Sequence, residues 1–194
     1  MAELGLFPLP IVLLPTEQVP LHIFEDRYKE LIDECLAEER PFGVLFAEGD
    51  GIHDVGTQAL VVEVLTRFDD GRLNILVEGG ERFRVDELTR GRSFQTGTTS
   101  PLGDDDDPAD LETIARALEL FERLRELTGS DVEAPAEDSP QLSYALAARV
   151  ELEPEVKQGL LQATSERARL DSVCELLVDC FQVILCSYEG RFCG

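Results

Sequence analysis

Short apolar runs punctuated by glycine and proline dominate the chain from Leu4 to about Thr99. Four of them have the length and composition of β-strands, at residues 41–47, 55–68, 72–78 and 82–88. Asp69-Asp70-Gly71 separates two of these runs, and its glycine supplies the positive φ that a tight hairpin turn requires. The pattern therefore predicts a β-rich half with a hairpin at residues 69–71.

One helix is expected to interrupt this β half. Six apolar residues recur at spacings of three and four, so that they share one helical face. They are Phe24, Tyr28, Leu31, Ile32, Cys35 and Leu36. Arg40-Pro41 should end the helix. An amphipathic helix within sheet-forming sequence is expected to pack on the sheet.

The chain changes character after residue 100. Residues 100–108 combine glycine, two prolines and four consecutive aspartates, which is typical of an exposed linker. Apolar positions beyond it follow a helical period, and Asp107-Pro108, Ser139-Pro140, Pro154 and Ser165 are expected helix starts. We predict an α+β fold with a β domain over 1–100, an acidic linker over 101–108 and a small helical bundle over 109–194.

The charge of the chain limits its partners. The formal net charge is −23, from 40 acidic and 17 basic residues in 194. Such a field repels phosphate backbones and anionic lipids, so the charge disfavours binding to nucleic acids and to membrane surfaces. No apolar run reaches the roughly 20 residues that span a bilayer, and the first residues lack a secretory signal. We expect a cytoplasmic protein.

Metal ligation and cofactor binding find no support in the motifs. The five cysteines form no CxxC pair, and His22 and His53 lack nearby ligands at usable spacing. The run Asp104 to Asp107 lacks the spaced ligands of a calcium loop, which leaves a solvated linker as the interpretation. We predict no metal and no cofactor, with Cys193 as the best candidate for a reactive thiol.

Catalytic motifs are also missing from these 194 residues. There is no GxxxxGK[ST] phosphate loop and no GxSxG nucleophile turn. A Ser/Lys dyad would need Lys29, which is expected on the polar side of one helix, or Lys157, which is expected in the first turns of another. We predict that the chain is not an enzyme.

Arginines gather between Arg67 and Arg92. Arg82 and Arg84 are two residues apart, so on a strand they point to the same side and could contact a small anion or an acidic peptide. Salt bridges on the surface are the favoured interpretation of the whole group.

The N-terminal block resembles the N-terminal, substrate-binding domain of Lon proteases. The resemblance continues in register along the β half and covers nearly the whole chain, with its end matched best at residues 155–177. The residues that carry it are Phe7-Pro8-Leu9-Pro10, Pro15, Pro20 to Glu25, Arg27-Tyr28, Phe42-Gly43-Val44, Val55-Gly56-Thr57, Asp70-Gly71-Arg72, Gly79 and Arg82 to Val85.

The resemblance implies a PUA-like β pseudo-barrel with one packed helix, followed by a helical domain. It also implies the arrangement of stand-alone bacterial Lon-domain proteins, without the ATPase and peptidase domains of full Lon enzymes. The activity of an ATP-dependent protease would then belong to the larger enzymes of the family and not to these residues. The chain departs from the family motif at Thr16, where glycine is common, and at Asp26, where proline is common.

A binding role also suits the residues themselves. The apolar segment Leu6 to Leu14 contains two prolines and is followed by Pro15, which favours an edge course over a central strand. It either packs as a wall of the β domain or leaves a hydrophobic groove open for a peptide. Phe24, Arg27 and Tyr28 are the expected anchors for that peptide, because aromatic residues and arginine often dominate binding energy.

These observations favour a non-enzymatic protein- or peptide-binding module. We expect it to recognise unfolded or tagged polypeptides or one specific protein partner, as an adaptor or regulator in protein quality control. Alternatives are an RNA-binding PUA-like protein, a structural or oligomerising protein, or an enzyme that uses the Cys193 thiol or carboxylates for hydrolysis.

Overall fold

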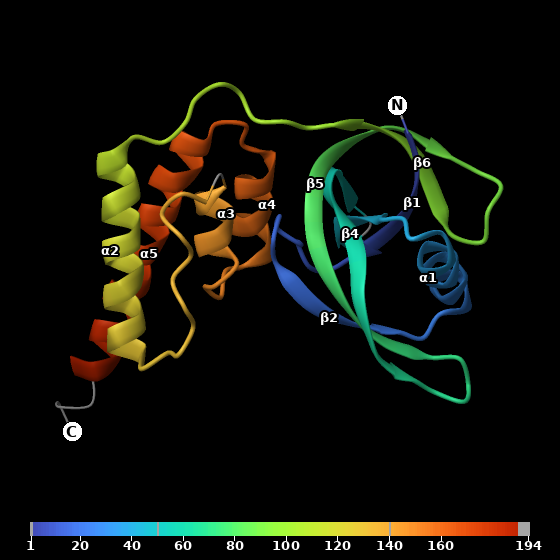
Figure 1. Ribbon diagram of the computed structural model, residues 1–194, viewed down its shortest axis with the longest axis horizontal. Coiled ribbons are helices and arrows are strands. Elements are labelled where there is room, and N and C mark those ends of the chain that lie inside the picture. Colours follow the sequence, from blue (N-terminus) through green and yellow to red (C-terminus); the bar gives the residue numbers. More distant parts are fainter. Residues whose placement is uncertain (1, 50, 140, 190–194) are drawn as a thin grey trace. The chain divides into compact units, whose positions relative to one another are not determined.

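Six strands pair into one mixed sheet in the computed structural model, which describes residues 2–49, 51–139 and 141–189 (Figure 1). The strands are β1 (Ala2–Leu9), β2 (Gln18–Ile23), β3 (Phe42–Glu48), β4 (Gly51–Arg67), β5 (Leu73–Thr89) and β6 (Gln95–Pro101). Their order is β2-β5-β4-β3-β1-β6, and β6 pairs with β5 as well as with β1. The pairings therefore close a ring of five strands, with β2 added outside it.

The ring is a pseudo-barrel and not a clean barrel. β1 and β3 run parallel, and the other pairs in the described chain are antiparallel. Register shifts interrupt the β3–β4, β4–β5 and β5–β6 ladders. Such bulges bend strands and increase their twist, which lets 17-residue strands such as β4 and β5 curve around a small core. The predicted α+β class is confirmed.

The hairpin at residues 69–71 is confirmed, whereas the two strands expected at 72–78 and 82–88 form a single strand with a register shift between Gly79 and Arg82. Gly71 has a φ of 81°, and the amide of Phe68 donates to the carbonyl of Arg72 at 2.9 Å. Residues 72–78 and 82–88 belong to one continuous strand, β5. Gly79 lies inside this strand. A side chain does not fit at this position, because the Leu14 carbonyl oxygen would lie 2.1 Å from an added Cβ. This glycine marks a close approach of two backbones.

Helix α1 (Asp26–Glu38) connects β2 to β3 and packs on the sheet, as predicted. Its buried residues Tyr28, Leu31, Ile32 and Cys35 lie in the same core cluster as residues of five strands. The periodicity also placed Phe24 on the apolar face of this helix, and this expectation is wrong. Phe24 precedes the helix and is 59% exposed.

Helix α4 (Pro154–Gln162) begins where the sequence predicts but belongs to the same compact unit as the sheet. Gln158 is buried and donates to the Val55 carbonyl at 3.1 Å, and buried Arg82 donates to the Leu161 carbonyl at 2.8 Å. The first unit thus comprises residues up to Gly103 together with 152–162, so the prediction of a helical domain over 109–194 differs from the structure in this segment.

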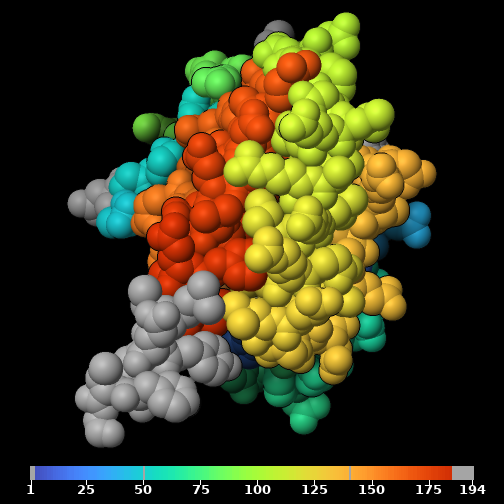
Figure 2. All heavy atoms as spheres, turned by 90° about the vertical axis from the view of Figure 1, so that its left-hand side faces the viewer, coloured from blue at the N-terminus to red at the C-terminus, as the bar shows by residue number. Residues whose placement is uncertain are grey.

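The second unit contains the helices α2 (Leu111–Thr128), α3 (Leu142–Ala147) and α5 (Glu166–Glu189). α2 and α5 lie side by side and run in the same direction (Figures 1 and 2). The expected cap at Asp107 is wrong: Asp110 caps α2 by accepting from the Thr113 amide at 2.8 Å. Ser165 caps α5 as expected, accepting from the Ala168 amide at 3.0 Å.

The acidic run 104–107 is anchored and is not simply a solvated linker. Asp104 accepts from the guanidinium of Arg169, whose side chain is fully buried. The same guanidinium donates to Glu166 at 2.6 Å and lies 4.3 Å from the ring centroid of Tyr144. Because burying an unpaired arginine is very costly, the carboxylates of Asp104 and Glu166 are required by the fold of this unit.

Candidate functional site

A groove of about 290 Å³ opens in the first unit. It is lined by the end of β1 and by the junction between β2 and α1. We call it the Phe24 groove. Two stretches of chain line it, Phe7 to Pro10 and His22 to Tyr28, excluding Asp26. The lining residues are mostly aromatic, aliphatic or proline. Such a composition suits the burial of apolar side chains of a ligand.

The wall of the groove is a rigid aromatic stack. The rings of Phe7 and Tyr28 lie 3.9 Å apart between centroids, and both residues are buried. The guanidinium carbon of Arg27 lies 4.5 Å from the Tyr28 ring centroid, a cation–π distance. Burial raises the pKa of the Tyr28 phenol, and Arg27 opposes this effect. The phenol is therefore neutral and available as a hydrogen-bond donor throughout the physiological range.

The rim of the groove is polar apart from Phe24. His22 is exposed and shares a hydrogen bond of 2.6 Å with Asn74 through its Nδ1 atom. Its ring also stacks near Phe24, with 5.9 Å between centroids. Arg27 forms an ion pair with Glu25 at 2.8 Å. Phe24 is thus a large apolar side chain held at the mouth of an apolar groove.

The strand edges next to the groove are poor in backbone donors. In the described chain, β2 pairs only with β5, and Phe7 to Leu9 pair only with β3. Such free edges usually invite pairing with another strand. Pro8, Pro10 and Pro20 have no N–H group, so none of these positions can donate to an added strand. Binding in the groove therefore depends on side chains more than on strand addition.

The segment that follows β1 is fixed by contacts with distant parts of the chain. The carbonyl of Leu13 accepts from the Thr57 hydroxyl at 2.6 Å, and the amide of Leu14 donates to the Glu17 carboxylate at 2.9 Å. Lys157 of α4 pairs with the same carboxylate at 2.5 Å. These bonds fix the chain immediately after the stretch Phe7 to Pro10 that lines the groove.

The three predicted anchor residues Phe24, Arg27 and Tyr28 meet in this groove. The apolar segment that the sequence left open as wall or groove does both, since Leu13 and Leu14 are buried while Leu9 and Pro10 line the opening. The sequence did not indicate His22 as a lining residue. The alternation of exposed His22 with buried Ile23, which lie on the strand β2, would have been the signal.

Arg82 and Arg84 do not form an open anion site. Arg82 is buried and holds α4, and exposed Arg84 forms an ion pair with Asp54 at 2.9 Å. Arg67, Arg72 and Arg92 also face carboxylates, at 3.6 Å or less for their nearest oxygens. The salt-bridge interpretation therefore holds at Arg67, Arg72, Arg84 and Arg92, but not at Arg82.

No group of three or more histidine, cysteine or acidic side chains is placed to hold a metal ion in the described part of the chain. Among the same residues, no helix has the length and apolar character that crossing a membrane requires. Cys35 is buried, which raises the pKa of its thiol to about 11. Cys193, the predicted reactive thiol, lies outside the described residues.

Comparison with known proteins places these features in a family context. The family model described as the ATP-dependent protease La (LON) substrate-binding domain matches residues 3–179. Lon proteases of Paraburkholderia phytofirmans and Rhizobium meliloti are 28% and 25% identical to this chain, over 92% and 83% of it. The chain spans only 24% and 22% of the length of these two relatives.

Solved structures show the same fold. A Lon N-terminal domain protein from Xanthomonas campestris superposes with a TM-score of 0.69 at 28% identity, covering 89% of this chain and 97% of that one. The N-terminal domain of Lon protease from the Mycobacterium avium complex gives a TM-score of 0.71 at 19% identity, covering 92% and 99%.

Proposed function

The chain belongs to the family of LON substrate-binding domains, and on this premise we propose that its Phe24 groove binds apolar segments of unfolded or tagged polypeptides. The observation that carries the proposal is the exposure of Phe24 beside the buried Phe7–Tyr28 stack. A large aromatic side chain exposed at the mouth of an apolar groove has the placement that aromatic binding anchors usually have.

The recognition is expected to tolerate many sequences. Apolar contacts have no directional requirement, and the proline-rich edges supply few hydrogen bonds that would fix a register. A folded protein hides its apolar segments and therefore offers little to this groove. Selectivity for unfolded polypeptides follows from exposure of apolar side chains and not from a sequence motif.

The test measures fluorescence anisotropy of labelled, permanently unfolded polypeptides against the full chain, with a folded protein as the negative control. Phe24→Ala should weaken binding about tenfold, as loss of an aromatic anchor does. The matched variant is Leu88→Ala, which removes another apolar side chain, 52% exposed, from β5 outside the groove. Equal affinities for the two variants would overturn the proposal.

The proposal extends to an adaptor or regulator that acts in the cytoplasm in protein quality control without catalysis of its own. It is supported by the match to a substrate-binding domain and by the lack of phosphate-loop and Ser/Lys motifs within these 194 residues. Purified chain mixed with ATP and an unfolded polypeptide should release no phosphate and no fragments. Turnover that persists through repeated purification would contradict this part of the proposal.

A further inference from the structure

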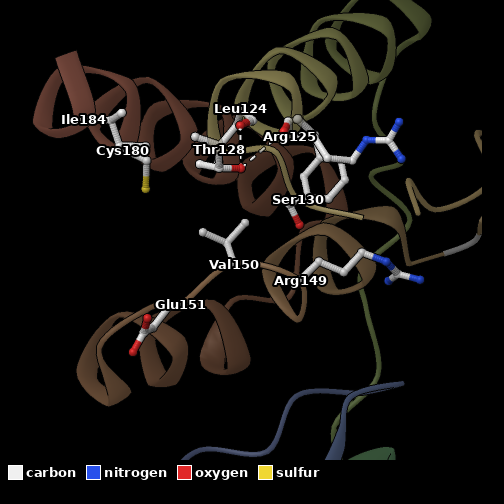
Figure 3. Close-up of a pocket in the computed structure, with 10 residues that line it drawn as sticks. Leu124, Arg125, Thr128, Ser130, Arg149, Val150, Glu151, Cys180 and Ile184 are labelled. Carbon is white, nitrogen blue, oxygen red and sulfur yellow. Dashed lines mark hydrogen bonds between the residues drawn. The ribbon is translucent and has the colours of Figure 1, made fainter. Parts of the chain in front are cut away.

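The second unit contains a pocket of about 460 Å³, which is larger than the Phe24 groove and shares no lining residue with it. We call it the helical pocket. It opens near the C-terminal parts of α2 and α5 and beside the segment that follows α3 (Figure 3). Its apolar lining includes Phe121, Leu124, Val150, Cys180 and Ile184.

The two ends of the helical pocket differ in polarity. Figure 3 shows the guanidinium groups of Arg125 and Arg149 on one side, with Ser130 between these residues. Cys180 and Ile184 lie on the other side, where the carboxylate of Glu151 also points away from the arginines. The pocket therefore has an apolar end, and the two guanidinium groups form a cationic end at its outer edge, where they point away from Val150 and Cys180.

The positive charge at the cationic end is only partly neutralised. Arg149 donates to the carbonyls of Glu133 and Ala145 at 3.0 and 2.6 Å, and the described residues include no carboxylate partner for it. Arg125 donates to the Val132 carbonyl at 3.1 Å and pairs with Glu122 at 3.1 Å. Carbonyl groups satisfy hydrogen bonding but leave the net charge of a guanidinium in place. In a chain of net charge −23, an exposed arginine beside an apolar pocket is complementary to a carboxylate.

We propose that the helical pocket binds the apolar C-terminal end of a polypeptide, with its last side chains against Val150 and Ile184 and its α-carboxylate on Arg149. A chain end fits better than a free fatty acid because the pocket is open: Val150 and Ile184 are only partly buried. Small-molecule sites usually enclose most of their ligand, whereas a polypeptide must leave the pocket toward solvent.

The test compares two labelled peptides with the same apolar C-terminal sequence, one with a free carboxylate and one with a C-terminal amide. The carboxylate form should bind the full chain about tenfold more tightly, because a charge-assisted hydrogen bond is lost in the amide. Arg149→Gln should remove this preference, and Arg149→Lys should keep part of it. Arg116→Gln, which removes an exposed arginine of α2 outside the pocket, should leave it intact.

Alkylation of Cys180, followed by peptide mapping, gives an independent readout. The carboxylate peptide should slow alkylation of Cys180 in the unmodified chain and in the Phe24→Ala variant, which separates this site from the groove. Equal affinity for the carboxylate and the amide, or equal effects of Arg149→Gln and Arg116→Gln, would overturn the proposal. Tighter binding of a free aliphatic acid than of the peptide would overturn the assigned occupant.

Discussion

Phe24 and Tyr28 lie at the same groove but contribute differently to the molecule. Phe24 is 59% exposed and contacts little of the core, whereas Tyr28 is 7% exposed and stacks on Phe7. A residue that serves binding can therefore be separated experimentally from one that also serves the fold.

Replacing these two residues should change binding and stability in different proportions. Phe24→Ala should lower the free energy of unfolding by less than about 0.5 kcal/mol, as substitutions of exposed residues do. Tyr28→Ala should lower it by about 3 kcal/mol, because it opens a cavity beside Phe7. Urea unfolding followed by circular dichroism measures both. A loss of 2 kcal/mol or more for Phe24→Ala, about what core substitutions cost, would show that this side chain supports the fold.

Thr16 occupies a backbone conformation that favours glycine. Its φ is 66°, and its amide donates to the Gly79 carbonyl at 2.7 Å. The departure from the family motif at this residue thus falls on a left-handed position, where a side chain costs about 1 kcal/mol.

Thr16→Gly should therefore stabilise the protein by about 0.5 kcal/mol, after the larger chain entropy of glycine in the unfolded state is subtracted. Thr16→Ala keeps the left-handed side chain and serves as the control, with little expected change. Thermal unfolding of the three proteins is the measurement. A lower melting temperature for the glycine variant would show that the Thr16 side chain makes a favourable contact.

At the scale of elements, helix α4 completes the packing of the β half. Leu161 is buried at 1% exposure, and its carbonyl accepts from buried Arg82 in β5. The strands thus rely on a helix that follows them by many residues, and whose Lys157 contacts Glu17 across 140 positions of sequence.

Leu161→Ala should lower the free energy of unfolding by about 2–4 kcal/mol, as loss of a buried leucine does. Leu111→Ala makes the same chemical change at a site that is 77% exposed and should have almost no effect. Hydrogen exchange at the amides of β5 gives the local readout. If exchange there stays as slow as in the unmodified chain, α4 does not stabilise the sheet.

Local signals in the sequence explain which elements were predictable. The hairpin depends on Gly71, and α1 on a repeat of apolar residues, so neighbouring residues suffice for both. Phe24 fitted that repeat but lies outside the helix, because periodicity does not show where a helix begins. The partners of Asp104 and Gln158 lie 65 and 103 residues away, so no local pattern reveals them.

The same distinction holds for the candidate site. Phe24, Arg27 and Tyr28 could be proposed because their residue types are typical of binding anchors. Their position opposite Leu9 and Pro10 depends on the closure of the sheet, which pairs β1 with β3 and β6. The burial of Arg82 likewise depends on α4, so a strand pattern alone suggested an open anion site.

At the scale of the whole molecule, the net charge of −23 governs encounters with partners. Unfolded polypeptides rich in lysine or arginine should associate faster than acidic ones of equal apolar content. This advantage should shrink as the salt concentration rises from about 50 to 300 mM, because salt screens the attraction. Stopped-flow fluorescence measures the association rates.

An RNA hairpin provides the opposite test of the same charge. No mobility shift is expected even at about 50 mM salt, where electrostatic attraction to nucleic acid is strongest. A salt-sensitive shift would favour the RNA-binding alternative. In the polypeptide experiment, stopped-flow association rates that do not depend on the charge of the polypeptide would show that the electrostatic field of the protein does not steer association.

The most direct test of the central claim places a photo-crosslinking benzoyl-phenylalanine at position 24 of the full chain, and at position 88 as the control. Irradiation with a labelled unfolded polypeptide should give a crosslinked product from position 24 that an unlabelled apolar peptide competes away, and little product from position 88. Equal crosslinking from both positions, or none from position 24, would contradict the assignment of the Phe24 groove as the polypeptide-binding site.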